Sequence, residues 1–218
     1  MYTLYIGNKN YSSWSLRAWV LLKAAGVPFV DQKILLSTPR SSAQILAVSP
    51  NGRVPCLRDG DRVVWDTLAI AEYLAERHPG LWPADATARA WARCVVAEMH
   101  SGFVALREQF AMDVRKRDVV RPTQQTAADI ARIDAIWREG RERFGRHGKF
   151  LCGTFGIVDA FWCPVAFRFR SYGVTLTDVS SGYCESLLAF PAMLEWETAA
   201  VAEREVIDIA TAAVTRQP

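Results

Sequence analysis

Residues 54–65 of the chain are Val-Pro-Cys-Leu-Arg-Asp-Gly-Asp-Arg-Val-Val-Trp, two short β-like runs on either side of Asp59 and Gly60. An Asp-Gly pair supplies the positive φ that a tight hairpin turn demands, so the stretch predicts two antiparallel strands. Pro55 has no N–H to donate to a sheet, which places it at the start or at the edge of a strand. The stretch therefore predicts a β-hairpin with a proline where its first strand begins.

The segments before and after this hairpin alternate between strand and helix. Strand-like runs over 3–6 and 29–36 precede it, and helices are expected over 14–25, 41–48 and 68–77. The order β-α-β-α-β-β-α, with a proline at the start of the third strand, favours a thioredoxin-like fold. No C-x-x-C opens the first helix and serines stand there instead, so dithiol redox chemistry is not expected.

The pattern changes beyond Pro83, where the β-like runs stop. Residues 87–114, 123–144, 158–171 and 187–200 carry the apolar residues expected of helices, mostly three or four positions apart. The chain is therefore expected to form an α/β thioredoxin-like N-terminal domain, residues 1–80, and an all-α C-terminal domain, residues 87–218.

Composition excludes several classes of protein. Of the 218 residues, 50% are hydrophobic and 22% are charged, and the net charge is only +3, without the basic stripe of a nucleic-acid binder. No apolar run is long enough for a membrane span, and the first residues look like a strand rather than a signal peptide. The five cysteines are scattered without a C-x-x-C pair, which argues against a disulfide framework and a metal site. We expect reduced thiols, mostly in the core, and a cytoplasmic protein with no nucleic-acid, membrane or metal partner.

Two strand-to-helix junctions carry the polar groups of a candidate site. Ser12 and Ser13 precede the first helix, and Asp66 and Thr67 precede the third. A helix start directs N–H groups and the positive end of its dipole at a nearby anion, so a serine hydroxyl there can help to stabilise a thiolate. The Asp-Thr pair could hold the ammonium and carboxylate groups of an amino acid. Ordinary helix capping explains both pairs without a ligand, and the residues alone leave both interpretations open.

The proline of the hairpin offers a third candidate. If the Val54–Pro55 bond is cis, Val54 turns its N–H and C=O outward, where they can pair with a peptide ligand as an added strand would. An ordinary trans proline before a strand is the alternative, because few X–Pro bonds are cis.

Together, the order and spacing of these features resemble those of cytosolic glutathione S-transferases. The resemblance rests on Ser49-Pro-Asn-Gly-Arg-Val-Pro-Cys-Leu57 and on Asp66-Thr-Leu-Ala-Ile-Ala-Glu-Tyr-Leu-Ala-Glu-Arg-His-Pro79, and it extends over the helical part of the chain. The run Ser12-Ser-Trp-Ser-Leu-Arg17 is most similar to serine-type members, the zeta class (maleylacetoacetate isomerases) and its bacterial relatives. The resemblance implies the glutathione S-transferase architecture for the whole chain.

The resemblance also implies an enzyme with glutathione as co-substrate. Ser13 or Ser12 would bind the glutathione sulfur, which is conjugated to a small hydrophobic electrophile in detoxification. The remaining glutathione contacts would come from Val54 ahead of Pro55 for the cysteinyl unit, Asp66 and Thr67 for the γ-glutamyl group, and Arg53 or Lys33 for the glycine carboxylate. The electrophile would lie between the domains, against Tyr11, Trp14, Met99, His100, Phe103 and Arg107. Members of the family form homodimers, so a homodimer is expected.

Three positions depart from the family pattern. Asp66-Thr67 stands where Glu-Ser or Asp-Ser is usual, and Gly156-Ile-Val-Asp159 replaces a Ser/Thr-x-x-Asp cap. Trp14 stands where zeta enzymes commonly carry cysteine, which weakens the isomerase interpretation in particular. Two alternatives accompany the transferase interpretation: a glutathione-dependent cis–trans isomerase of the maleylacetoacetate type, and a non-catalytic interaction module with the same fold.

Overall fold

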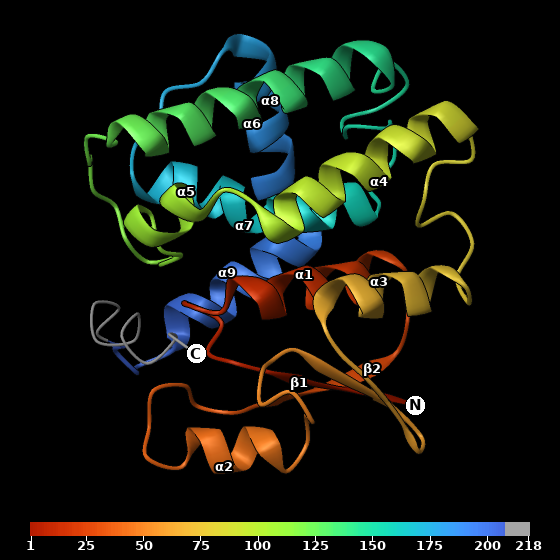
Figure 1. Ribbon diagram of the computed structural model, residues 1–218, viewed down its shortest axis with the longest axis vertical. Coiled ribbons are helices and arrows are strands. Elements are labelled where there is room, and N and C mark those ends of the chain that lie inside the picture. The colour runs from red at the N-terminus through yellow and green to blue at the C-terminus, as the bar shows by residue number, and fades with distance from the viewer. Residues whose placement is uncertain (208–218) are drawn as a thin grey trace.

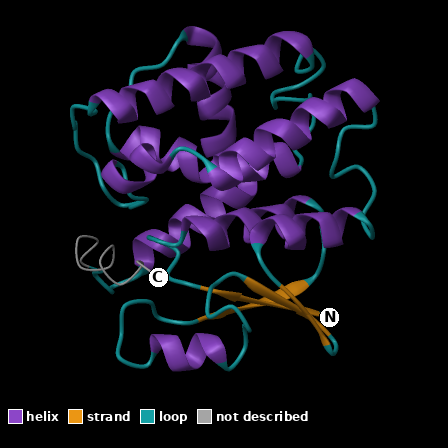
Figure 2. Ribbon diagram, viewed as in Figure 1, coloured by secondary structure: helices purple, strands orange, loops and turns teal. Residues whose placement is uncertain are grey.

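The computed structural model of the chain describes residues 1–207, and its N-terminal part has the predicted element order (Figures 1 and 2). The elements of this part are β1 (Tyr2–Ile6), α1 (Ser13–Ala24), β2 (Phe29–Lys33), α2 (Ser41–Leu46), β3 (Cys56–Asp59), β4 (Arg62–Val64) and α3 (Thr67–Ala75). They form the expected thioredoxin-like mixed sheet with its helices.

The sheet has the strand order β2-β1-β3-β4, with β1 parallel to β2 and antiparallel to β3. Gly60 has a φ of 59° in the turn between β3 and β4, as the Asp-Gly pair predicts. In Figure 1, α1 and α3 lie side by side between the sheet and the helical region, and α2 covers the other face. Helices α1 and α3, whose starts carry the predicted serine and Asp-Thr pairs, therefore both lie in the layer between the sheet and the helical region.

The chain continues as a helical region. Its elements are α4 (Ala86–Ser101), α5 (Val104–Gln109), α6 (Gln124–Arg143), α7 (Ile157–Ser171), α8 (Asp178–Leu188) and α9 (Pro191–Ala202). Nearly every side chain of α7 is buried, and this helix packs against α1, α4 and α8. Helix α7 is thus the centre of the core and joins the helical region to the N-terminal domain.

Two helix predictions were wrong in this region. The helix expected over 87–114 ends at Ser101, because Gly102 is extended and Phe103 adopts a left-handed conformation with a φ of 59° before α5 begins. The helix expected over 187–200 is divided at Phe190. Helix α8 ends before this residue and Pro191 starts α9. Most of α8 was not predicted, because its sequence lacks a continuous apolar repeat. Proline is favoured in the first turn of a helix because its missing N–H has no partner there in any case.

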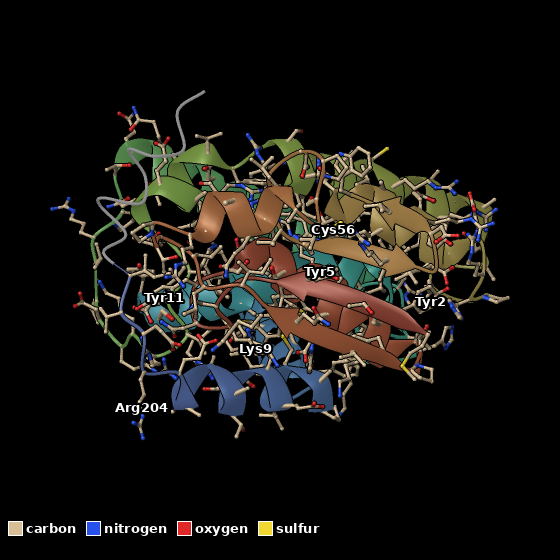
Figure 3. All side chains as sticks on the ribbon, turned by 90° about the horizontal axis from the view of Figure 1, so that it is seen from below. Tyr2, Tyr5, Lys9, Tyr11, Cys56 and Arg204 are labelled. Carbon is tan, nitrogen blue, oxygen red and sulfur yellow. The ribbon has the colours of Figure 1, made fainter. Side chains whose placement is uncertain are left out.

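The last described helix returns to the N-terminal domain. Helix α9 runs along the β2 edge of the sheet (Figure 3). Trp196 packs edge-on against Trp19 of α1 with ring centroids 5.3 Å apart, and its indole N–H donates to the carbonyl oxygen of Lys9 at 2.9 Å. The end of the described chain is thereby fixed beside the loop that leads into α1.

The five cysteines lie in different environments. All five cysteines are free, and Cys56, Cys163 and Cys184 are buried, whereas Cys94 is exposed. Within residues 1–207 no group of His, Cys, Asp and Glu side chains is arranged to hold a metal ion. No helix in the same range has the length and apolar character needed to cross a membrane.

Candidate functional site

The loop between β1 and α1 places two buried serines at the start of the helix. Ser12 is the N-cap and Ser13 is the first helical residue. The Ser12 hydroxyl donates to Ser15 Oγ at 2.7 Å, and Ser15 Oγ also accepts the backbone N–H of Gly7 at 3.0 Å. Within residues 1–207, the Ser13 hydroxyl makes no hydrogen bond. The two serines therefore differ: Ser12 is bonded within its own turn, and the Ser13 hydroxyl is unused.

A residue that the sequence did not reveal fixes this loop. The buried carboxylate of Glu203 accepts the backbone N–H groups of Lys9 at 2.8 Å and Asn10 at 3.0 Å. Arg115 donates to the carbonyl oxygen of Glu203 and, at 3.0 Å, to the hydroxyl of Tyr11. Glu203 lies 194 positions from Lys9. No local sequence signal connects segments so far apart, so only the fold reveals this contact.

The same carboxylate occupies one predicted glutathione contact. Lys33 Nζ lies 3.2 Å from Glu203 Oε1 and 3.7 Å from Glu205 Oε1. The alternative residue, Arg53, is exposed, and its backbone N–H donates to Asn51 Oδ1 at 3.0 Å. Of the two candidates, Arg53 is thus the one without an ion pair among residues 1–207.

The Val54–Pro55 peptide bond is cis. Pro55 is buried, and the ladder between β1 and β3 begins at the next residue, where Cys56 pairs with Tyr5. Within the described residues, the backbone N–H and C=O of Val54 make no hydrogen bond. Val54 therefore keeps both main-chain groups available just before the sheet begins.

Asp66 and Thr67 lie at the start of α3. The Asp66 carboxylate caps the helix by accepting the N–H of Leu68 at 3.0 Å, and its side chain remains 46% exposed. Its other oxygen, Oδ2, lies 3.1 Å from Nε2 of His100 on α4. Thr67 is buried, and its hydroxyl has no hydrogen-bond partner within residues 1–207. The preceding Trp65–Asp66 peptide bond is also cis.

The residues predicted to line an electrophile site fall into two groups. Tyr11, Trp14, His100 and Arg107 are partly exposed. Met99 and Phe103 are only 1% and 7% exposed, and Phe103 packs against Trp162 inside the helical core. The apolar side chains of these two residues fill the core, and the four partly exposed residues are the ones that a ligand can reach in this structure.

Aromatic rings and cations meet where α1, α4 and α5 come together. The rings of Trp14 and His100 lie edge to face, with centroids 5.2 Å apart. The guanidinium groups of Arg17 and Arg107 lie 4.3 Å and 4.9 Å from the centroid of Trp14. Such contacts are favourable cation–π interactions. Trp14 therefore connects the serine loop, the segment between β1 and α1 that ends at Ser12, to the helical region.

Arg17 is buried with no hydrogen bond to its guanidinium nitrogens among the described residues. Besides Trp14, its guanidinium stacks on Phe161 at 4.9 Å. Burial, reinforced by Arg107 and Arg168, holds the pKa of Arg17 well below its usual range. The positive charge in this layer therefore has few carboxylates to balance it, and Asp66 is the carboxylate that acts on Arg17.

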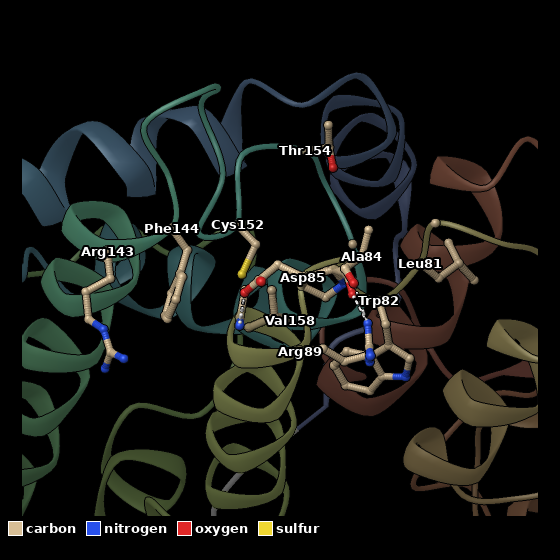
Figure 4. Close-up of a pocket in the computed structure, with 14 residues that line it drawn as sticks. Leu81, Trp82, Ala84, Asp85, Arg89, Arg143, Phe144, Cys152, Thr154 and Val158 are labelled. Carbon is tan, nitrogen blue, oxygen red and sulfur yellow. Dashed lines mark hydrogen bonds between the residues drawn. The ribbon is translucent and has the colours of Figure 1, made fainter.

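A cavity of about 780 Å³ lies elsewhere, where the segment that leads into α4 meets the ends of α6 and α7 (Figure 4). It contains none of the predicted site residues. The side chains drawn around it include Trp82, Asp85, Arg89, Arg143, Phe144 and Cys152. Burial raises the pKa of the Cys152 thiol to about 12, so this thiol is not a ready nucleophile.

Comparison with known proteins adds a domain match and a fold to this geometry. Residues 11–77 match the family model described as "Glutathione S-transferase, N-terminal domain". The stringent starvation protein A homolog of Haemophilus ducreyi is 24% identical over 166 residues, which cover 75% of this chain and 73% of that protein. Glutathione S-transferase GstB of Escherichia coli K12 is 27% identical over 154 residues, which cover 62% of this chain and 67% of that protein.

Solved structures show the same fold over nearly the whole chain. A glutathione transferase homolog from Burkholderia gl BGR1, solved with bound glutathione, has a TM-score of 0.69 at 24% identity, covering 93% of this chain and 98% of that one. A maleyl pyruvate isomerase, described as a bacterial glutathione S-transferase in the zeta class, has a TM-score of 0.71 at 21% identity, covering 94% and 100%. The thioredoxin-like domain followed by a helical region is therefore the architecture of these proteins.

Proposed function

We propose that this chain, whose residues 11–77 match the glutathione S-transferase N-terminal domain, is a member of that family, binds glutathione and conjugates it to a small hydrophobic electrophile. The observation that carries the proposal is a set of unused polar groups within residues 1–207. They are the Ser13 hydroxyl, the N–H and C=O of Val54 and the Thr67 hydroxyl. A thiolate, a peptide main chain and a carboxylate are the partners that these groups lack.

In this mechanism the reactive thiol comes from the ligand. A serine hydroxyl at the start of α1 donates to the glutathione sulfur, and the helix dipole favours the same negative charge, so the thiol loses its proton more readily. Val54 pairs with the cysteinyl unit, while Asp66 and Thr67 hold the γ-glutamyl ammonium and carboxylate. The thiol proton passes to solvent, and the thiolate attacks the electrophile beside Tyr11, Trp14 and Arg107. A carbon–sulfur bond forms as the bond to the leaving group breaks, which is the carbon–halogen bond of an aryl halide, and the halide departs with its electron pair. The protein contributes positioning and electrostatic stabilisation rather than a nucleophile of its own.

The test measures binding and rate in parallel for Ser12→Ala and Ser13→Ala. Isothermal titration of glutathione gives the affinity, and a chromogenic aryl halide gives the conjugation rate. Loss of one stabilising donor at a developing or bound anion costs about 100-fold in rate, and we expect that loss for the serine that contacts the sulfur. Ser186→Ala on α8, whose hydroxyl bonds only to Gly182 O, is the matched control and keeps full rate. Full rate in both serine variants would show that the serine assignment is wrong.

Two other functions compete with this one, and each predicts a different measurement. A glutathione-dependent isomerase returns its glutathione unchanged, whereas a transferase consumes one glutathione for each product. A non-catalytic interaction module is favoured by the relatives that are named stringent starvation protein A homologs rather than transferases. Failure to bind immobilised glutathione would support that module. We also propose a cytoplasmic homodimer, which light scattering of the purified chain tests for its oligomeric part.

A further inference from the structure

One contact between the N-terminal domain and the helical region bears on the proposed glutathione site and is not explained by it. His100 Nε2 lies 3.1 Å from Asp66 Oδ2 and joins the end of α4 to the start of α3. In Figure 1 the last turn of α4 descends toward the starts of α1 and α3. The remaining side of the Asp66 side chain stays open, at 46% exposure. A ligand ammonium can therefore reach this carboxylate while His100 is bound to it.

The surroundings of His100 determine its protonation. Its Nδ1 atom is buried without a hydrogen-bond partner among the described residues, so a proton on Nδ1 would have no acceptor. The groups that face the ring are Asp66 on α3, Arg17 and Trp14 on α1, Arg107 on α5 and Phe161 on α7. Burial lowers the pKa of His100, Asp66 opposes that effect, and the two arginines add to it. The favoured form is the neutral imidazole with its proton on Nε2.

We propose that His100 is a positioning residue for the γ-glutamyl ammonium: as a neutral donor it fixes the Asp66 carboxylate without cancelling its charge. The proposal rests on the proposed function, because Asp66 is the ammonium contact only if glutathione binds. An imidazolium at the same place would put a second cation beside the carboxylate and compete with the ligand. Glutathione affinity is therefore highest when His100 is neutral and falls as the pH is lowered through the titration of His100.

The size of the effect follows from the fraction of protein in the competent form. The apparent Kd equals the intrinsic Kd divided by the neutral fraction of His100. Because burial lowers the pKa of His100 from its ordinary value, acidification from about pH 7.5 to about pH 5.5 weakens glutathione by no more than about tenfold. A merely structural histidine would change the stability of the fold without linking the affinity for an ammonium to its own protonation. The pH profile of the affinity thus separates the two roles.

The experiment titrates glutathione calorimetrically at these two pH values into the wild type, His100→Gln and His147→Gln. Glutamine keeps a neutral N–H donor and removes the titration, so His100→Gln should give a Kd ratio near one between the two pH values. His147 is exposed on the loop after α6, and His147→Gln should keep the wild-type ratio. Glutaryl-cysteinyl-glycine, which lacks only the ammonium, should show no weakening at low pH with the wild type.

The outcomes separate this inference from the proposed function. Equal pH dependence in the wild type and His100→Gln, or equal weakening of the analogue that lacks the ammonium, would overturn the role of His100 alone. Absence of glutathione binding at either pH would overturn the proposed function and this inference with it. Nitrogen-15 NMR of the histidine rings is a check that needs no ligand. It should show an Nε2–H tautomer for His100 whose pKa falls in Asp66→Asn, and a protonated ring at pH 7.5 would contradict the proposal.

Discussion

Helices α3 and α7 both begin beside an aspartate, and the two carboxylates lie in opposite surroundings. Asp159, in the first turn of α7, is completely buried and accepts the backbone N–H groups of Leu151 and Gly156 and the hydroxyl of Tyr183. Asp66, at the N-cap of α3, accepts one backbone N–H, contacts His100 and is half open to solvent. The fold supplies every partner of the first carboxylate and leaves room for a ligand at the second.

The glycine that precedes Asp159 shows how tightly the closed helix start is built. A side chain at Gly156 would place its Cβ 2.7 Å from the backbone oxygen of Leu81, which already accepts the N–H of Ile157 at 3.0 Å. The usual Ser or Thr cap of the family therefore has no space here. The hydroxyl half of the capping box is therefore absent, and Asp159 supplies the other half by accepting the N–H of Gly156 at 3.0 Å. The departure seen in the sequence is a consequence of this close approach to the segment that leads into α4.

The largest expected difference between the starts of α3 and α7 is the loss of stability when the aspartate is removed. Asp159→Ala leaves three buried donors without an acceptor, and we expect it to lower the free energy of unfolding by about 3–5 kcal/mol. Asp66→Ala loses an exposed cap and should cost about 1 kcal/mol. Urea denaturation followed by circular dichroism measures both variants. Comparable losses would show that the two helix starts do not differ in the way described.

For glutathione affinity the order should be reversed: a change at the start of α3 should have a larger effect than a change at the start of α7. With the proposed function, Asp66→Ala loses most of the affinity because the ligand ammonium loses its carboxylate. Tyr183→Phe, which removes one donor of the closed site, should leave the calorimetric affinity unchanged below the unfolding temperature. A loss of affinity in Tyr183→Phe equal to that in Asp66→Ala would mean that the two sites are coupled.

The second effect concerns the pH dependence of stability. Burial raises the pKa of Asp159 to about 6, although three hydrogen bonds oppose the shift. An unfolded aspartate titrates near about 3.9, so the group contributes its full stability below that pH and loses it as the pH rises to about 6. Between these limits the wild type should lose roughly 3 kcal/mol relative to Asp159→Asn, whose amide does not titrate. Denaturation of both proteins at several pH values gives this difference, and a constant difference would contradict the shift.

Much of the fold could be predicted from the sequence, because local signals define it. Gly60 in the β3–β4 turn and Pro55 before β3 each mark a boundary that the structure keeps. The break at Gly102 and Phe103 was missed because the apolar period continues through it, and a left-handed phenylalanine has no sequence signal. Only the packing of Phe103 against Trp162 shows why the chain turns there.

The site was predictable to a different extent. Local signals predicted the helix starts that carry Ser12, Ser13, Asp66 and Thr67 and the proline that follows Val54, and the resemblance supplied their proposed roles. The contacts from the other end of the chain do not: Glu203 on the serine loop and His100 on Asp66 depend on how the helical region is docked. The burial of Met99 and Phe103 depends on the same docking. A helical period identifies apolar positions but does not show which of them face the core.

The smallest expected effect concerns Thr67, at the start of α3 where a ligand would bind. The Thr67 hydroxyl is buried without a hydrogen-bond partner in residues 1–207, and such a group is a cost to the free protein. Thr67→Val has nearly the same shape and removes that cost, so it should raise the free energy of unfolding by about 0.5–1 kcal/mol in the absence of ligand. With the proposed function, the same change removes a donor to the γ-glutamyl carboxylate and weakens glutathione by about tenfold.

Thr67→Ser is the matched control, since it keeps the hydroxyl and loses only a methyl group. We expect it to keep the glutathione affinity and to gain no stability. Thermal unfolding with and without saturating glutathione measures both quantities in one series, because a ligand that binds only the folded state raises its stability. A valine variant that is less stable without ligand would mean that the hydroxyl has a partner in the free protein. The start of α3 would then be closed, like the start of α7, and the distinction between the two helix starts would fail at this residue.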